Sequence, residues 1–196
     1  IMPSLVGSEM CIRDRFMATK HGLVKKTPLS EFKNLRKSGL IAINLREGDE
    51  LLKVKVTRGD ADIIIVSQEG NAIKFNEQDV RPMGRTASGV KSMNLRENDI
   101  AVCMDIAVDD EELLVISENG YGKRTPVSEY KRQNRGGVGL ITYKISEKTG
   151  KVVGAIVCKN DDELMLINTS GIAIRINVSD ISCLLYTSDA ADDMQC

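Results

Sequence analysis

Basic side chains cluster in two stretches of this chain, where they could bind an anionic polymer. Residues 20–39 carry six Lys or Arg residues against one acid, and residues 120–139 carry five against one. Acidic residues gather instead at 109–112 and 161–163. Rows of Lys and Arg attract a phosphate backbone through their charge and through the release of its counterions. The formal net charge of -1 therefore does not argue against nucleic-acid binding.

Residues suited to catalysis or metal binding are scarce. His21 is the one histidine, so neither a Ser-His-Asp triad nor a histidine-containing zinc site can be assembled. The acidic segments lack the spacing of a calcium loop, and no glycine-rich phosphate loop occurs. Cys103 and Cys158 lie in apolar runs without a C-x-x-C motif, which predicts buried thiols in a reducing compartment. We expect no catalytic residue and no metal site in this chain, and no membrane-spanning helix.

An internal repeat places the basic stretches. Four segments align on turn glycines that stand 48, 50 and 51 residues apart, and a second glycine recurs at positions 39, 89 and 139. A base follows each turn glycine by four residues, an acid by nine and an apolar residue by ten. We expect the apolar position in the core and favour a structural role for the acid. The turn glycines are Gly22, Gly70, Gly120 and Gly171, the bases are Lys26, Lys74, Arg124 and Arg175, the acids are Glu31, Asp79, Glu129 and Asp180, and the apolar residues are Phe32, Val80, Tyr130 and Ile181.

Each unit of the repeat predicts four short strands. An apolar run, a turn ending in glycine and an alternating return strand predict one hairpin. The strand after the second glycine, a charged turn and a further apolar strand predict a second hairpin. Four strands in about 50 residues, repeated, are typical of a propeller-like blade. We expect an all-β fold of four-stranded blades at 16–61, 62–111 and 112–162 with a half blade at 163–182, which together form an incomplete ring.

The two ends share no pattern with the repeat. One coding of Met-Cys-Ile-Arg-Asp at residues 10–14, read on the opposite DNA strand, begins Cys-Leu-Leu-Tyr-Thr, the sequence at 183–187. We interpret residues 1–15 and 183–196 as an inverted sequencing tag that resembles a transposase end, and we set them aside. The remaining residues 16–182 hold 25 basic and 23 acidic side chains, a formal charge of +2.

Stacked blades would join the basic segments into one positive rim, with the acidic turns on the opposite side. Such a rim suits the phosphate backbone of duplex DNA, with little reading of base sequence. A solvated surface whose charges average out is the simpler alternative. The side chains that we expect to contact duplex DNA are Lys25, Lys26, Lys33, Arg36, Lys37, Lys74, Arg81, Arg85, Lys91, Lys123, Arg124, Lys131, Arg132, Arg135 and Arg175.

Several motifs together resemble the C-terminal domain of the DNA gyrase A subunit. They are HGLVKKTPLSEF, KSGLIAINLREGDEL, DVRPMGRTASGVK and YGKRTPVSEYKRQNRGGVG, and the similarity covers residues 16–182. The last motif ends in a heptad similar to the GyrA-box, a Gln-basic-Arg-Gly-Gly-basic-Gly sequence. Asn134 and Val138 stand where that box has basic residues, so we favour a degenerate copy, with the true box upstream. The heptad residues are Gln133, Asn134, Arg135, Gly136, Gly137, Val138 and Gly139.

Within the heptad, two interpretations stay open. Arg135 could reach a phosphate, and Gly136 and Gly137 could let backbone N–H groups approach one. The two glycines could equally form a tight corner of a blade.

The resemblance implies a β-pinwheel of about six blades whose neighbours exchange strands and whose basic rim is wrapped by DNA. In that family the wrap serves ATP-driven introduction of negative supercoils, and the partners in a heterotetramer are a second A subunit with the gyrase B subunit. The family's catalytic tyrosine lies upstream, so none of Tyr121, Tyr130 and Tyr143 takes that role. The resemblance further implies a non-catalytic, cytoplasmic, chromosome-associated region without a cofactor, and no membrane partner.

Two rival functions remain. The C-terminal domain of the topoisomerase IV A-type subunit is similar but has fewer blades and an eroded box. The run of KRTP, RPMGRTASGVK and NLREGDE favours gyrase. The other rival is a propeller that serves as a protein-interaction scaffold, which would not need a base at the fourth position of every unit.

Overall fold

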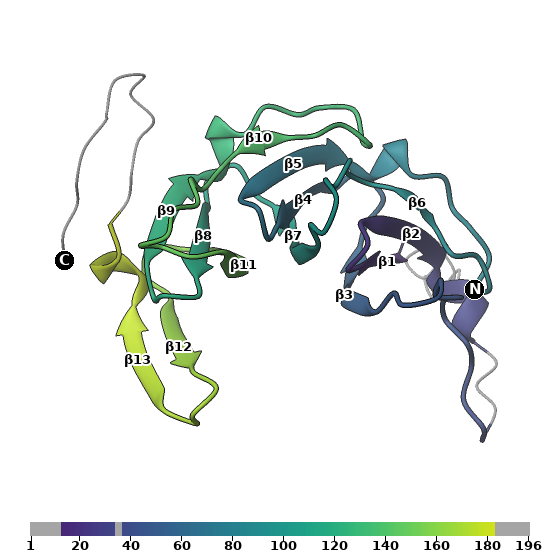
Figure 1. Ribbon diagram of the computed structural model, residues 1–196. Coiled ribbons are helices and arrows are strands. Elements are labelled where there is room, and N and C mark those ends of the chain that lie inside the picture. Colours follow the sequence, from purple (N-terminus) through teal and green to yellow (C-terminus); the bar gives the residue numbers. More distant parts are fainter. Residues whose placement is uncertain (1–12, 34–36, 183–196) are drawn as a thin grey trace, which may run out of the picture.

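The computed structural model describes residues 13–33 and 37–182, which form β-strands joined by turns and single-turn 3-10 helices. Figure 1 shows successive sheets along an arc that does not close, which confirms the predicted all-β fold and incomplete ring. The strands are β1 (Asp14–Thr19), β2 (Leu23–Pro28), β3 (Leu51–Thr57), β4 (Asp62–Ser67), β5 (Asn71–Asn76), β6 (Val90–Lys91), β7 (Ala101–Ala107), β8 (Glu112–Ser117), β9 (Gly122–Pro126), β10 (Leu140–Ile141), β11 (Val152–Cys158), β12 (Glu163–Ile167) and β13 (Ala173–Asn177). The 3-10 helices are η2 (Leu29–Phe32), η3 (Glu77–Asp79), η4 (Val127–Glu129) and η5 (Val178–Asp180).

The predicted hairpin around each turn glycine is present in all four units. β1 pairs with β2, β4 with β5, β8 with β9, and β12 with β13, all antiparallel. The four turn glycines have φ between 73° and 84°, a region that side chains other than glycine rarely adopt. Glycine at this position thus sets the register of each hairpin.

The predicted second hairpin is wrong, because the strand after the second glycine pairs with the preceding unit. β6 pairs with β2, and β10 pairs with β5, while β7 pairs with β4 instead. The second glycine permits this close approach, since a Cβ on Gly89 would lie 2.6 Å from the Val24 carbonyl oxygen. Residues 40–45 of the first unit form no strand, and the described residues include no earlier hairpin for them to join.

The sheets therefore have the order β3-β1-β2-β6, β10-β5-β4-β7, β11-β8-β9 and β12-β13. In Figure 1, β3, β7 and β11 face the inside of the arc, and the exchanged strands β6 and β10 lie toward its convex side. The short 3-10 helices also follow the convex side. The predicted blade borders divide the sequence into repeats, but each of the first two sheets takes one strand from the next repeat. As domain limits, these borders stay a prediction.

The core fills the spaces between sheets. Phe16 and Val24 of the first sheet pack with Ile65 and Phe75 of the second, and a separate cluster joins the second sheet to the third. Three of the four tenth-position residues, Phe32, Val80 and Tyr130, are buried as predicted, and Ile181 is half-buried. Burial of one apolar stripe per sheet thus requires the neighbouring sheet.

On the inside of the arc, an ion-paired cluster joins the first two sheets. Asp105 on β7 is buried and lies 3.0 Å from Lys53 Nζ and 2.8 Å from Lys55 Nζ, both on β3. Burial alone would raise the pKa of the Asp105 carboxyl. The hydrogen bonds from Lys55 and Lys53, the charge of Lys53 and a hydrogen bond from the Ile106 amide together outweigh burial, so the pKa lies below its ordinary value. The equivalent position of the third unit is Ala155, which packs in an apolar cluster.

Both predicted core cysteines are buried and free. Burial raises the pKa of the Cys103 thiol to about 12 and that of Cys158 to about 11. Both thiols therefore stay protonated and unreactive near neutral pH.

The tag-like ends lie largely outside the described residues, and so does Arg36. Strand β1 begins at Asp14, so its first two residues belong to the stretch that we set aside. The interpretation of 1–15 and 183–196 as a tag stays a prediction. Among the described residues, no helix has the length and apolar character that crossing a membrane requires.

Candidate nucleic-acid interface

The bases at the fourth position after the turn glycine are buried between units. Lys26 and Lys74 are each 5% exposed. Lys26 Nζ donates to the Glu77 carbonyl at 3.0 Å, and Lys74 Nζ donates to the Val127 carbonyl at 3.4 Å and pairs with Asp109. Glu77 and Val127 are the first residues of η3 and η4, so both lysines bind the same point of the following unit.

The third base makes the most bonds. Arg124 is 6% exposed and lies 2.7 Å from Glu112 Oε2 and 2.7 Å from Asn160 Oδ1. It also donates to the carbonyl of Ile181 at 2.7 Å, directly after η5, and to the carbonyl of Ser179 at 3.4 Å, within η5. The last base, Arg175, is exposed and pairs with Glu163 within its own hairpin.

The preceding position carries a lysine in two units, and its side chain also turns inward. Lys25 is fully buried, with Nζ donating to the carbonyls of Ala42, at 2.7 Å, and Arg85. Burial lowers the pKa of the Lys25 ammonium, and the nearby Arg85 guanidinium lowers it further. Lys123 is half-buried and donates to the Thr142 carbonyl at 3.2 Å.

We therefore assign the fourth-position bases to the junctions between blades. A buried ammonium or guanidinium is stable only where carbonyls or carboxylates replace its water, and the next unit supplies at least one carbonyl to each of Lys26, Lys74 and Arg124. The same bonds account for the recurrence of a base in the three complete units, whereas Arg175 pairs within its own hairpin. That recurrence therefore no longer separates a DNA-binding domain from a scaffold. Lys25, Lys26, Lys74 and Arg124 are not available to a ligand at the surface.

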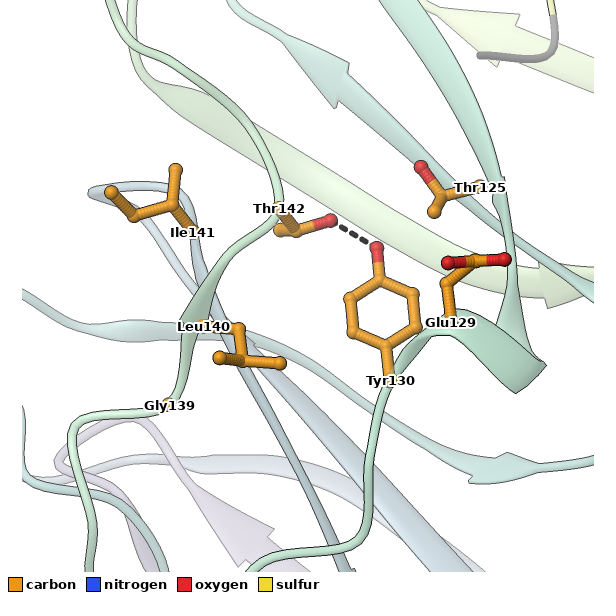
Figure 2. A pocket seen from close by; sticks show the side chains of 7 residues that line it. All are labelled: Thr125, Glu129, Tyr130, Gly139, Leu140, Ile141 and Thr142. Carbon is orange, nitrogen blue, oxygen red and sulfur yellow. Dashed lines mark hydrogen bonds between the residues drawn. The ribbon is translucent and has the colours of Figure 1, made fainter. Parts of the chain in front are cut away.

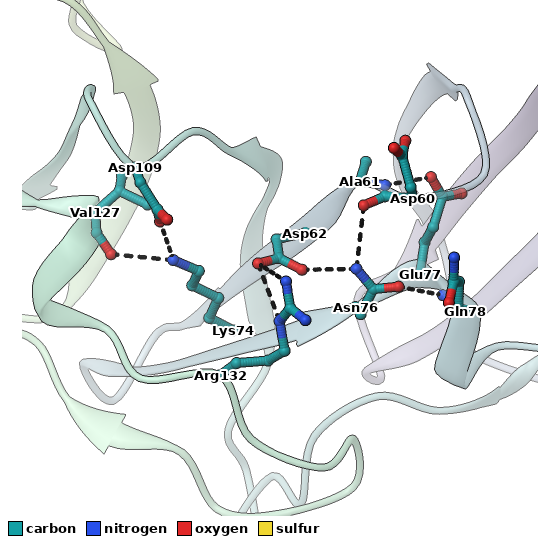
Figure 3. A network of polar contacts seen from close by, with 10 residues as sticks. All are labelled: Asp60, Ala61, Asp62, Lys74, Asn76, Glu77, Gln78, Asp109, Val127 and Arg132. Atoms are coloured by element: carbon teal, nitrogen blue, oxygen red, sulfur yellow. Dashed lines mark hydrogen bonds and ion pairs between the residues drawn. The ribbon is translucent and has the colours of Figure 1, made fainter.

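Acidic turns lie beside the basic segments and not on the opposite side, contrary to our expectation. Figure 3 shows two ion pairs: Asp109, from the turn between β7 and β8, pairs with Lys74, and Asp62 of β4 pairs with Arg132. The distance between Asp62 Oδ2 and Arg132 Nη2 is 2.8 Å. Lys74 lowers the pKa of the Asp109 carboxyl, and Asp62 raises the pKa of the Arg132 guanidinium. The positive surface is therefore narrower than the sequence suggested.

A different repeat position remains exposed and basic. Lys33, Arg81 and Lys131 each stand eleven residues after a turn glycine, directly after or close to the end of a 3-10 helix. All three are exposed, and no described residue pairs with their side chains. Their shared eleventh position in the repeat is the sequence signal that could have distinguished them from the buried bases.

The remaining predicted contacts differ in exposure. Lys37 and Lys91 are exposed, and Lys91 Nζ donates to Asn94 Oδ1 at 2.6 Å. Arg85 and Arg135 are half-buried, and both bind backbone carbonyls of the preceding unit. The exposed part of the candidate interface thus comprises Lys33, Lys37, Arg81, Lys91, Lys131, Arg132 and Arg175.

The heptad crosses from η4 to β10 along the preceding unit. Gln133 N donates to the Lys74 carbonyl at 2.8 Å, and Gly136 N donates to the Ser92 carbonyl at 2.6 Å. Gly136 and Gly139 have φ of 83°, which glycine adopts at little cost. A Cβ on Gly139 would overlap the Ala72 carbonyl oxygen, so this glycine permits the close approach of β10 to β5.

Two hollows flank the heptad. One, of about 500 Å³, is lined by Thr125, Glu129, Leu140 and Ile141, and Figure 2 shows the Tyr130 hydroxyl bonded to Thr142 at its wall. The other, of about 460 Å³, is polar and is lined by Asn76, Gln78, Asp79, Arg132, Gln133 and Asn134. Within the described residues, no group of three or more His, Cys, Asp or Glu side chains could hold a metal.

A family model described as the DNA gyrase C-terminal domain, a β-propeller, matches residues 16–58, 61–102, 111–159 and 162–184. The chain belongs to this family. It is 70% identical over 166 residues to the DNA gyrase A subunit of Clostridium acetobutylicum, which covers 85% of this chain and 20% of that protein. It is 44% identical over 167 residues to the DNA gyrase A subunit of Klebsiella oxytoca, covering 85% and 19%. The chain therefore spans about a fifth of the curated relatives it matches.

Two solved C-terminal domains share the fold of this chain. A DNA gyrase A C-terminal domain superposes with a TM-score of 0.81 at 31% identity, covering 90% of this chain and 59% of that one. A DNA topoisomerase IV C-terminal domain gives a TM-score of 0.85 at 28% identity, covering 91% and 56%. The backbone is thus shared with the topoisomerase IV rival, and the sequence identity to the gyrase A subunit is what distinguishes the two.

Proposed function

We propose that this region of a gyrase A C-terminal domain binds duplex DNA without sequence preference and wraps it around the convex side of the arc. The observation that carries the proposal is the exposed base at the eleventh position of each complete unit: Lys33, Arg81 and Lys131. Each follows a 3-10 helix on the convex side in Figure 1. One free cation per blade, repeated along an arc, suits a curved phosphate backbone.

Local charge pairing supports this choice of contacts. Arg132 and Arg175 are exposed but already pair with Asp62 and Glu163, so a phosphate would have to compete with a carboxylate. Lys33, Arg81 and Lys131 have no such competitor among the described residues. Their contribution to DNA affinity should therefore exceed that of the paired arginines.

In the parent protein, we propose that the wrap serves ATP-dependent introduction of negative supercoils. The partners would be a second A subunit together with the gyrase B subunit. The region that breaks DNA would lie outside this chain. The parent protein would act in the cytoplasm, on the chromosome. Within this chain, Tyr130 and Tyr143 are buried in the core between the second and third sheets, and Tyr121 lies against Lys148.

A salt titration of duplex binding tests the proposal. Fluorescence anisotropy on a random-sequence duplex should give a log-log salt slope of about -0.9 per neutralised phosphate. Replacing Lys33, Arg81 and Lys131 together by Gln should reduce the slope by about 2.7, equally on unrelated duplexes. The matched control replaces Arg46 and Arg96, exposed bases that share another repeat position, and should leave the slope unchanged.

The alternatives give different results. A folded chain without salt-dependent binding would refute DNA wrapping and support the scaffold. A loss that differs among duplexes of different sequence would refute contact through phosphates alone. Supercoiling assays on the native full-length protein then distinguish gyrase activity from the relaxation expected of topoisomerase IV, and the same three substitutions should reduce supercoiling.

A further inference from the structure

Two arginines occupy equivalent places in the segments that join neighbouring units. Arg85 and Arg135 each stand fifteen residues after a turn glycine. Arg85 Nη1 donates to the Ile41 carbonyl at 3.4 Å, and Arg135 Nη1 donates to the Lys91 carbonyl at 3.0 Å. Ile41 and Lys91 are themselves equivalent, since each stands two residues after the second glycine of its unit. The same bond therefore forms at both junctions.

At the second junction the arginine is held more firmly. Arg135 Nε also donates to the Asp79 carbonyl at 3.0 Å, so the guanidinium bridges two backbone carbonyls of the preceding unit. Next to it, Gly136 N donates to the Ser92 carbonyl at 2.6 Å, and Asn94 N donates to the Gly137 carbonyl at 2.7 Å. The planar fork of arginine suits two such acceptors, which a lysine ammonium could not bridge in the same way.

These bonds fix the backbone next to two exposed lysines. One acceptor is the carbonyl of Lys91 itself, and Lys131 begins the segment that Arg135 ties down. Lys91 belongs to the second unit and Lys131 to the third. The bond from Arg135 to the Lys91 carbonyl joins the backbone segments that carry the two lysines. Freeing Arg135 would loosen the backbone that carries both lysines, although the backbone bonds of Gln133 and Gly136 still join the segment to the preceding unit.

We propose that Arg135, the arginine of the GyrA-box-like heptad, is a positioning residue that latches this segment onto the preceding blade and so presents Lys91 and Lys131 to DNA. At the first junction Arg85 makes the equivalent but longer bond to the Ile41 carbonyl. Arg81 stands there at the position of Lys131, whereas Ile41 stands at the position of Lys91. The heptad acts as a clamp between blades, and its arginine does not itself contact a phosphate. This inference rests on the proposed DNA binding.

Salt titrations in a background that lacks Lys91 and Lys131 distinguish the latch from a direct contact. In the Lys91→Gln, Lys131→Gln double variant, Arg135→Gln should leave the salt slope unchanged, because the residues through which it acts are gone. A direct phosphate contact would reduce the slope by a further 0.9 or so in that background. In the otherwise native chain, Arg135→Lys should bind as weakly as Arg135→Gln, whereas a direct contact would let lysine preserve binding.

Hydrogen exchange supplies a readout that does not depend on DNA. The Asn94 amide, bonded to the Gly137 carbonyl, should exchange faster in both Arg135→Lys and Arg135→Gln than in the native chain. Arg96→Gln, a nearby exposed arginine, is the control and should change neither exchange nor slope. Unchanged exchange at Asn94 would overturn the latch. A native chain that does not bind DNA would overturn the proposed function and the positioning role together, even where exchange shows the latch itself.

Discussion

Replacing Arg124 by Met should loosen the last half blade without unfolding the rest of the arc. Met keeps most of the apolar stem but removes bonds to Glu112, Asn160 and the Ile181 carbonyl, each 2.7 Å long. The bonds that reach the last half blade are those to the carbonyls of Ile181, at 2.7 Å, and Ser179, at 3.4 Å. A hydrogen bond to a charged group contributes about 1.5 to 3 kcal/mol, so we expect a loss of about 3 kcal/mol at this junction.

Hydrogen exchange followed by mass spectrometry measures this cost locally. A loss of about 3 kcal/mol corresponds to roughly 100-fold faster exchange of the amides in β12, β13 and η5. Amides of β1 and β2, at the other end of the arc, should keep their native rates. The matched control is Arg175→Met, the same chemical change at the same repeat position on an exposed side chain, which should accelerate exchange less than threefold.

Two results would refute this reasoning. Equal acceleration in Arg124→Met and Arg175→Met would show that burial of the fourth-position base contributes nothing to the junction. Acceleration spread evenly over all sheets would show that the arc opens as one unit, so that no single junction could be loosened alone.

Three further predictions concern stability and reactivity. Gly89→Ala should lower the melting temperature more than Gly120→Ala, because both strain a positive φ, at about 1 to 2 kcal/mol, but only the former overlaps a carbonyl oxygen, at about 2 kcal/mol more. In the Asp105→Asn variant, the free energy of unfolding should fall less between pH 7 and acid pH than in the native chain. The depressed pKa of Asp105 stabilises the fold above about pH 4, and this contribution is lost as the pH falls through its folded value. Cys103, with its pKa raised to about 12, should resist iodoacetamide at pH 8 until the protein unfolds, as peptide mapping can show.

The hairpins were predictable because their information is local. An apolar run, a polar turn ending in Gly22 or Gly70, and an alternating return strand specify one antiparallel pair without reference to anything distant. The exchanged strands were not predictable in this way. Val90 and Lys91 make a strand of two residues, and what decides its partner is whether a backbone can approach Val24, more than 60 residues earlier.

The candidate site was predicted as a set of basic residues but not sorted correctly. A lysine is exposed unless something replaces its water, so Lys26 and Lys74 looked like surface residues. The carbonyls that bury them belong to the next unit, about 50 residues away, and become neighbours only through the packing of sheets. Recurrence alone could not separate these lysines from Lys33 and Lys131, because a repeated junction and a repeated binding position leave the same periodic signal.

The exchange of strands between units imposes an order on synthesis. The outer strand of the first sheet, β6, leaves the ribosome 34 residues after the end of β3. At about 5 to 20 residues per second, the first sheet therefore waits roughly 2 to 7 s for its last strand. During that interval the outer edge of β2 has unpaired backbone groups, and the same delay recurs for β5 until β10 emerges. Each unit of a nascent chain is thus completed by its successor, so a ribosome that stalls between units leaves an open strand edge as the site where misassembly can begin.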